Sequence, residues 1–350
     1  MILSDLELYV VEMPSQGDEP PLRSLVVRLA AENGLEGWGE SRAEWRPGEL
    51  AARRDALLPN LAGRSAFDIE DLLAQPVLRA PAVRLAIEMA SWDLVGRIAG
   101  QPICHLFGGG YRRGVPLSVR IEGRTPAKTA GLAREMAEQG FHCQTIAASG
   151  DLACDLEMFA AVRQMVPDRT EIRFDLAASY DFTAAWDLCS RIEGQPLQFL
   201  LDPLRSPDLD QVASLRRQTN VPLAVGRALR GPSDVLALVR SGAAPAAVID
   251  LTLVGGLVPA RKCASVLQAA GLSGALAVGG TLGIAAAAMV QLAAATPAYT
   301  LSCECGYHPL RDDLLVEPLA LVDGMLAVPH GPGLGIEVDR GKLDRHQVDW

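Results

Sequence analysis

Residues 197–226 read LQFLLDPLRSPDLDQVASLRRQTNVPLAVG, and this stretch decides the fold. Two short β-forming apolar runs enclose a segment with helical spacing of its leucine, valine and alanine residues. Six more runs of this kind lie on either side, so that all eight are spaced about 25 residues apart. Three precede it, VPLSVRI from 115, FHCQTIAA from 141 and EIRFDLA from 171, and three follow it, AAVIDLTL from 246, ALAVGG from 275 and YTLSCEC from 299. Eight strands alternating with helices predict an α/β protein with a (β/α)8 barrel.

The flanks of this repeat differ from it in composition. Residues 1–113 begin with alternating strands around an Asn33-Gly34 hairpin turn and continue with helical segments, which predicts an α+β capping domain. The barrel is expected over 114–315, and the Gly- and Pro-rich segment 316–350 is expected to return to the cap. An open doubly wound sheet is the alternative, but no strand is followed by a GxGxxG turn.

Charge and hydropathy limit the partners. The 350 residues carry a net charge of −10 and have a mean hydropathy of +0.17, and Lys and Arg are scattered, so nucleic acid is not expected as a partner. Residues 263–303 contain no charge, but glycines and Pro297 interrupt them, so we expect a buried strand and helix and no membrane span. Asp5 and Glu7 do not fit a signal peptide, which predicts a cytoplasmic protein. The seven cysteines, without a CxxC pair, predict reduced, mostly buried thiols.

Four blocks of sequence resemble the enolase superfamily, in its mandelate racemase and muconate-lactonizing branch. They are GWGE at 37–40, AIEMASWDLVGRIAGQPICHLFGG at 86–109, DLTLVGGLVPARKCA at 250–264 and VPHGPGLGIEVD at 328–339. The resemblance implies an enolase-like barrel whose members remove the proton next to a substrate carboxylate. It also implies a Mg²⁺ held by carboxylates at the ends of the third, fourth and fifth barrel strands, with lysines or an Asp-His pair as acids and bases.

Several of these family positions hold other residues in this chain. On the second strand the two lysine positions are Thr145 and Ala147. Asp175 on the third strand matches the first metal ligand. The second ligand position is Leu201, with Asp202 next to it, and neighbouring strand residues point to opposite faces unless the backbone is re-aimed.

The remaining positions follow the same trend. The third ligand position is Gly226, followed by Arg227. Asp250 matches the aspartate of the Asp-His pair, but the histidine position is Gly280. Glu304 matches a glutamate that contacts substrate in the family. We therefore expect no bound metal, although the family implies Mg²⁺, and we expect Arg227 to contact a substrate carboxylate or Asp175.

These residues define the candidate site. Catalysis is assigned to Asp250, Asp175 and Glu304, although a buried Asp250 also suits a structural hydrogen bond. Substrate binding is assigned to the four side chains that come next to them at the strand ends: Arg227, Thr145, Asp202 and His308. Arg23, Trp45 and Arg46 in the cap loops are further candidates for ligand contact.

Three functions remain open at this stage. The first is a divergent isomerase or lyase that moves a proton on a small carboxylate or lactone without a metal. The second is a conventional Mg²⁺-dependent racemase, cycloisomerase or dehydratase in which Asp175 and Asp202 hold the ion. The third is a catalytically inactive scaffold that binds a ligand. A homo-oligomer, a dimer or an octamer, is expected in each case.

Overall fold

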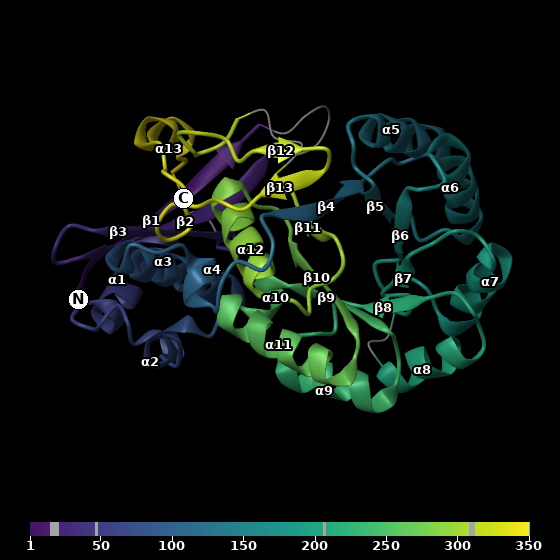
Figure 1. Ribbon diagram of the computed structural model, residues 1–350, viewed down its shortest axis with the longest axis horizontal. Coiled ribbons are helices and arrows are strands. Elements are labelled where there is room, and N and C mark those ends of the chain that lie inside the picture. The colour runs from purple at the N-terminus through teal and green to yellow at the C-terminus, as the bar shows by residue number, and fades with distance from the viewer. Residues whose placement is uncertain (15–20, 46–47, 206–207, 308–311, 350) are drawn as a thin grey trace.

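The computed structural model describes residues 1–14, 21–45, 48–205, 208–307 and 312–349. Its first part is an antiparallel sheet in the order β1-β2-β3, covered by helices. The strands and helices are β1 (Leu3–Met13), β2 (Leu22–Ala31), β3 (Glu36–Arg42), α1 (Leu50–Leu61), α2 (Ile69–Leu73), the short 3-10 helix η1 (Pro76–Leu78), α3 (Pro81–Ala99) and α4 (Ile103–Leu106). The hairpin expected at Asn33-Gly34 joins β2 to β3. This sheet with its helices is the cap (Figure 1).

The rest of the described chain is dominated by a closed parallel barrel of eight strands. The strands are β4 (Gly114–Ile121), β5 (Cys143–Ala147), β6 (Glu171–Asp175), β7 (Phe199–Leu201), β8 (Leu223–Val225), β9 (Ala246–Asp250), β10 (Ser273–Val278) and β11 (Cys303–Cys305). The intervening helices are α5 (Pro126–Glu138), α6 (Leu152–Met165), α7 (Phe182–Ile192), α8 (Leu209–Arg217), α9 (Pro232–Ser241), α10 (Leu251–Val254), α11 (Leu257–Ala270) and α12 (Gly283–Ala295). Pairing of β11 with β4 closes the ring, so the predicted fold class is confirmed.

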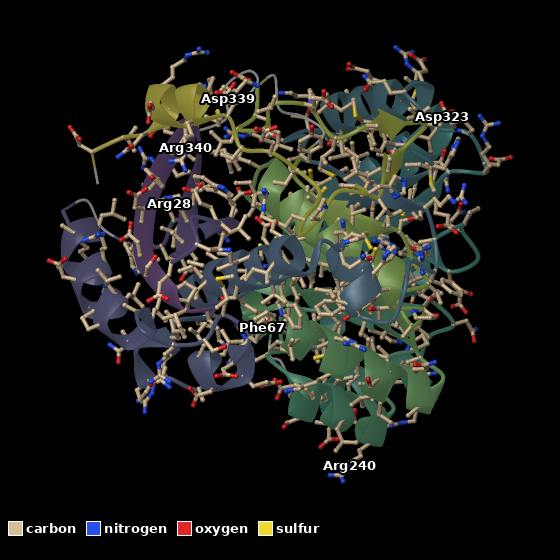
Figure 2. The ribbon with its side chains drawn as sticks, turned by 60° about the vertical axis from the view of Figure 1, so that its left-hand side comes forward. Arg28, Phe67, Arg240, Asp323, Asp339 and Arg340 are labelled. Carbon is tan, nitrogen blue, oxygen red and sulfur yellow. The ribbon has the colours of Figure 1, made fainter. Side chains whose placement is uncertain are left out.

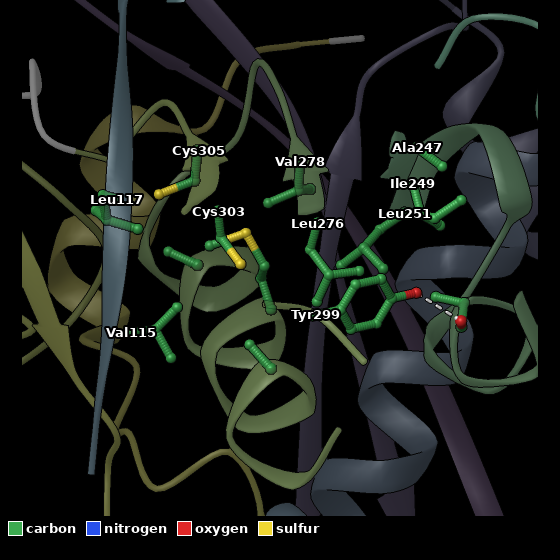
Figure 3. Packing of buried hydrophobic residues seen from close by; sticks show 14 of the residues in the cluster. Val115, Leu117, Ala247, Ile249, Leu251, Leu276, Val278, Tyr299, Cys303 and Cys305 are labelled. Atoms are coloured by element: carbon green, nitrogen blue, oxygen red, sulfur yellow. Dashed lines mark hydrogen bonds between the residues drawn. The ribbon is translucent and has the colours of Figure 1, made fainter. Parts of the chain in front are cut away.

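Small side chains and thiols pack around β11, the strand that closes the barrel. Cys303 and Cys305 lie on one face of β11, and the part-exposed Glu304 lies between them. Figure 3 shows the two thiols among the aliphatic side chains of β4 and β10, with Tyr299 donating to the carbonyl oxygen of Ala260 at 2.6 Å. All seven cysteines are free and six are buried, as expected. The charge-free segment contains the second half of α11, then β10 and the buried helix α12.

The C-terminal segment contacts both parts. The hairpin of β12 (Leu321–Val322) and β13 (Met325–Ala327) pairs with β4, and α13 (Arg340–His346) lies over the cap sheet (Figure 1). The backbone N–H of Val348 donates to Val10 O at 2.9 Å. In Figure 2 Arg340 lies near Arg28, and both guanidiniums bind the carboxylate of Glu36. The exact domain boundaries stay a prediction.

Buried carboxylates of the cap bind the N-termini of two barrel helices. Glu40, at the end of the GWGE block, accepts hydrogen bonds from Ser24 Oγ at 2.7 Å, from Ala285 N at 3.0 Å and from Leu282 N. Glu88 of α3 accepts from Val258 N at 2.8 Å, at the start of α11. Burial raises the pKa of each carboxyl group to about 7. These bonds fix the position of the cap over the barrel.

Two glycines of the same block allow β3 to lie directly on α3. A Cβ atom at Gly39 would come within 1.8 Å of Ala86 O, and one at Gly37 within 2.1 Å of Ala90 O. Because both obstacles are helix backbone, they cannot move aside without distorting α3. The block therefore combines close packing at its glycines with helix binding at its glutamate.

Among the residues that the structure describes, none of the helices combines the length and the apolar composition that crossing a membrane requires.

We expect Gly39→Ala to prevent folding or to lower the free energy of unfolding by more than about 3 kcal/mol, because the added methyl overlaps the backbone of α3. Chemical denaturation monitored by circular dichroism measures the change. Gly131→Ala is the matched control, since a methyl in the middle of α5 meets nothing within 4 Å and should stabilise by about 0.5–1 kcal/mol. Equal stability of the two variants would contradict the packing argument.

The raised pKa of Glu40 makes the stability of the fold depend on pH. The folded state keeps a proton on this group up to about pH 7, whereas the unfolded state releases it near the ordinary pKa of 4.5. Its contribution is therefore complete below 4.5 and is lost as pH rises through 7, by up to about 3 kcal/mol. Glu40→Gln cannot titrate, so its unfolding free energy should fall less between pH 4.5 and 8 in urea titrations. An unchanged pH slope in this variant would be the contrary result.

Candidate active site

Charged side chains gather at the carboxyl ends of the barrel strands, where this fold places its chemistry. Asp175 ends β6 and is 2% exposed. Its Oδ2 lies 3.0 Å from Nη1 of Arg120, at the end of β4, and 3.2 Å from Nη2 of Arg227, which follows β8. Its Oδ1 accepts the backbone N–H of Ala177 at 2.8 Å. Of the two contacts expected for Arg227, the ion pair with Asp175 is present, and a second guanidinium binds the same carboxylate.

Asp202 joins this cluster because the backbone turns at that position. It follows β7 with a φ of 48°, a left-handed conformation that non-glycine residues rarely adopt. Its carboxylate accepts from Gly226 N at 2.8 Å and from Arg227 N at 3.0 Å, and Arg227 Nε lies 3.7 Å from its Oδ2. Burial raises the pKa of Asp202 to about 6. The positive φ supplies the re-aiming that an ordinary strand register would not give.

Arg120 was not singled out by its sequence motif. It also contacts Glu122 Oε1 at 2.6 Å and Glu304 Oε1 at 3.5 Å. Burial opposes its charge, but Glu304 and Asp175 outweigh burial and raise the pKa of the guanidinium. Alternation within VPLSVRI carried the signal, because Ser118 and Arg120 share the face opposite to the apolar Leu117, Val119 and Ile121.

The remaining predicted residues fall into different surroundings. Thr145 is fully buried and hydrogen-bonded to Ser118 Oγ at 2.9 Å, below the charged cluster. Glu304 is 20% exposed and faces Arg120. His308 and Arg46 lie outside the described residues. The roles assigned to these side chains stay predictions.

Asp250 lies at the end of β9 and caps the short helix α10. Its Oδ1 accepts from Thr252 N at 2.8 Å, and burial raises the pKa of its carboxyl group. The charge of Arg42, from β3 of the cap, acts in the opposite direction. The side chain of Arg42 runs beside Gly280, with its Cγ 3.4 Å from the place where a Cβ at 280 would lie. A cap arginine thus lies beside Gly280, the position at which the family resemblance implies a histidine, and sequence spacing alone did not indicate this contact.

The cap loops supply ion pairs and ring contacts at the edge of the site. Arg23 binds Glu12 Oε2 at 2.6 Å. The guanidinium of Arg53 lies over the ring of Trp45, with its central carbon 5.8 Å from the ring centroid. Arg23 and Trp45 therefore both contact other protein side chains, and their contact with a ligand stays a prediction.

A barrel of this type, capped by an antiparallel sheet and carrying charged residues at its strand ends, defines an enolase-like protein. The family described as "Enolase C-terminal domain-like" matches residues 128–342, and "Mandelate racemase / muconate lactonizing enzyme, N-terminal domain" matches residues 20–108. The chain belongs to the mandelate racemase/muconate-lactonizing group of the enolase superfamily.

Known proteins resemble this chain over nearly their whole length. Muconate cycloisomerase 1 of Rhodococcus opacus is 27% identical over 90% of this chain and 88% of its own length. D-galactarolactone cycloisomerase of Agrobacterium fabrum is 29% identical over 93% and 91%. The crystal structure of an isomerase from Streptomyces coelicolor A3(2) has a TM-score of 0.87 and 28% identity, covering 99% of this chain and 96% of that one.

The carboxylates of this site do not fit the Mg²⁺ that the family implies. Asp175 is engaged by two guanidiniums and a backbone N–H, both oxygens of Asp202 accept backbone N–H groups, and the third ligand position is Gly226. In the described part of the chain, His, Cys, Asp and Glu residues do not gather in threes as candidate metal ligands. A divalent cation would also have to approach two arginines.

We expect calorimetric titration with Mg²⁺ and Mn²⁺ to give no saturable binding with a dissociation constant below about 1 mM. Arg227→Ala is the informative companion, because it removes one of the two cations on Asp175 and should strengthen any residual metal affinity. Saturable binding to the unaltered protein below that limit would restore the conventional metal-dependent site.

Proposed function

We propose that this chain is an isomerase or lyase that moves a proton on a small carboxylate or lactone substrate, with arginine side chains in place of a metal ion. The observation that carries the proposal is the convergence of Arg120 and Arg227 on Asp175 at the barrel mouth. The named activities of the relatives, cycloisomerases and an isomerase among them, support the reaction class.

Arg227 has the properties of a substrate-binding group. Half of its side chain is exposed, and only Nη2 is used by Asp175. A guanidinium carries five N–H donors in a planar fork, so it can hold Asp175 and still offer two donors to a substrate carboxylate. The same positive charge would stabilise the negative charge that develops when a proton leaves the neighbouring carbon.

Asp250 is the proposed acid or base. Burial raises the pKa of its carboxyl group, which brings it closer to the range useful for proton transfer. Glu304, held near Arg120, is the second candidate. Arginines stabilise the negative charge that forms on proton removal less strongly than a divalent ion does. The site therefore fits best a substrate whose C–H proton is already acidic, such as a lactone in which a second carbonyl group flanks that carbon.

A specific observation also favours a ligand-binding scaffold without catalysis. One oxygen of Asp250 is used to cap α10, and Asp175 is neutralised by two cations. Both carboxylates then have structural partners, and the arginines would still bind an anion. Homo-oligomer formation and a cytoplasmic location stay predictions under either function.

Proton transfer can be tested by incubating the protein with acid sugars, amino acids and lactones in deuterated water and following loss of the exchangeable C–H signal by NMR. We expect exchange with at least one substrate class, and we expect Asp250→Asn to slow it at least about 100-fold because a general base contributes roughly that much. Arg227→Ala should raise KM and lower kcat, whereas the exposed Arg240→Ala, a matched arginine loss on α9, should change neither. No exchange with any class would favour the scaffold.

A further inference from the structure

A pocket opens beside Arg227, between the segments that follow β7 and β8. Its volume is about 220 Å³. Aliphatic side chains form most of its wall, and they come from the segment after β7, from α8 and from β8: Leu204, Leu209, Val212 and Val225. Pockets for drug-sized ligands are roughly 300–1,000 Å³, so this one accepts a smaller molecule or one arm of a larger one.

The charged groups of this pocket favour an anion. Asp202 lines it, but both of its carboxylate oxygens already accept backbone N–H groups. Arg205 and Arg227 are exposed at the rim. One nitrogen of Arg205 donates to Ser179 O at 2.8 Å, and within the described residues Arg205 forms no salt bridge.

A second space adjoins the first beyond Arg227. It has a volume of about 360 Å³, shares Leu209, Arg227 and Ala228 with the first, and extends to Arg230 and to Asp234, whose carboxylate accepts the backbone N–H of Arg230 at 2.7 Å. Arg227 therefore lies at the junction of the two spaces and of the Asp175 cluster. A ligand anion held by Arg227 has an apolar wall directly next to it.

We propose that the pocket binds the branched aliphatic arm of a small carboxylate, whose carboxylate group is held by Arg227 and Arg205. The arm packs against Leu204, Leu209, Val212 and Val225, and the carboxylate takes the guanidinium donors that Asp175 leaves unused. The substrate class is thus a short-chain carboxylate with an aliphatic branch. Its role as substrate rests on the proposed function, whereas the binding itself does not.

Binding can be measured with 4-methylpentanoate as the probe, by isothermal titration calorimetry or ligand-observed NMR on the full chain. Acetate has the charge without the arm, and 4-methylpentan-1-ol has the arm without the charge. Each buried methylene changes affinity by about fourfold, so partial burial of the arm should make 4-methylpentanoate bind at least about tenfold more tightly than acetate. The alcohol should bind at least about tenfold more weakly than the acid.

Two pocket-filling variants test the location. Ala228→Phe and Leu209→Trp each place an aromatic ring into the space lined by both residues and should weaken 4-methylpentanoate binding at least about tenfold while leaving acetate binding unchanged. Arg227→Ala should weaken both acids. Arg240, which Figure 2 shows pointing away from the barrel at the end of α9, supplies the control Arg240→Ala with unchanged binding of both. Circular dichroism checks that each variant is folded.

Equal affinities for acetate and 4-methylpentanoate, no binding of either, or 4-methylpentanoate binding that survives both pocket-filling variants in folded protein would overturn the proposal. These outcomes are distinct from failure of the proposed function. Binding that depends on the aliphatic arm, without solvent exchange in any substrate, would support the pocket proposal and contradict the proposed function. Solvent exchange in an unbranched substrate, without any preference for the aliphatic arm, would support the proposed function and contradict the pocket proposal.

Discussion

The structure depends on buried cap carboxylates that bind the N-termini of barrel helices. Glu40 accepts hydrogen bonds from backbone N–H groups at the start of α12, and Glu88 accepts one at the start of α11. Asp93 accepts a hydrogen bond from Leu334 N, in the C-terminal segment, at 2.8 Å. A helix N-terminus leaves such donors unpaired, and the oxygens of a buried carboxyl group satisfy them by accepting hydrogen bonds. The cap is therefore attached by directional bonds, and the mouth of the barrel has a defined second wall from which Arg42 projects.

The charge balance of the site follows from its position under that wall. Arg120 approaches Asp175 from β4 and Arg227 approaches it from the segment after β8, and Asp202, whose backbone is left-handed, lies close to Arg227. Each charge lies close to an opposite charge, and this attraction offsets part of the desolvation cost of a partly buried polar cluster. Yet the guanidinium of Arg227 remains half exposed, so the cluster presents a positive group to whatever enters.

The strand rhythm predicted all eight barrel strands, because a regular βα repeat fixes which residues reach the mouth. The family positions predicted that Arg227 would contact Asp175 or a substrate carboxylate, and the first of these contacts is present. Three features depend on the three-dimensional arrangement of the chain and could not be predicted from the sequence. Alternation places Arg120 on the same face of its strand as Ser118, but its contact with Asp175 depends on how the strands close into the barrel. The position of the Asp202 side chain depends on a φ of 48°, which the residue types around it do not predict. Arg42 comes from a different layer, and its approach to Gly280 depends on how cap and barrel dock.

Gly280 bears on whether this barrel can hold an Asp-His pair. Its φ is +66°, and Arg42 fills the adjoining volume. A histidine at this position would have to adopt a left-handed backbone, which costs a non-glycine residue about 1 kcal/mol or more, and its Cβ would lie in contact with the side chain of Arg42. An imidazole opposite Asp250 would therefore start from a strained backbone. The conformation of the loop after β10, and not only the residue type, disfavours an Asp-His pair in this barrel.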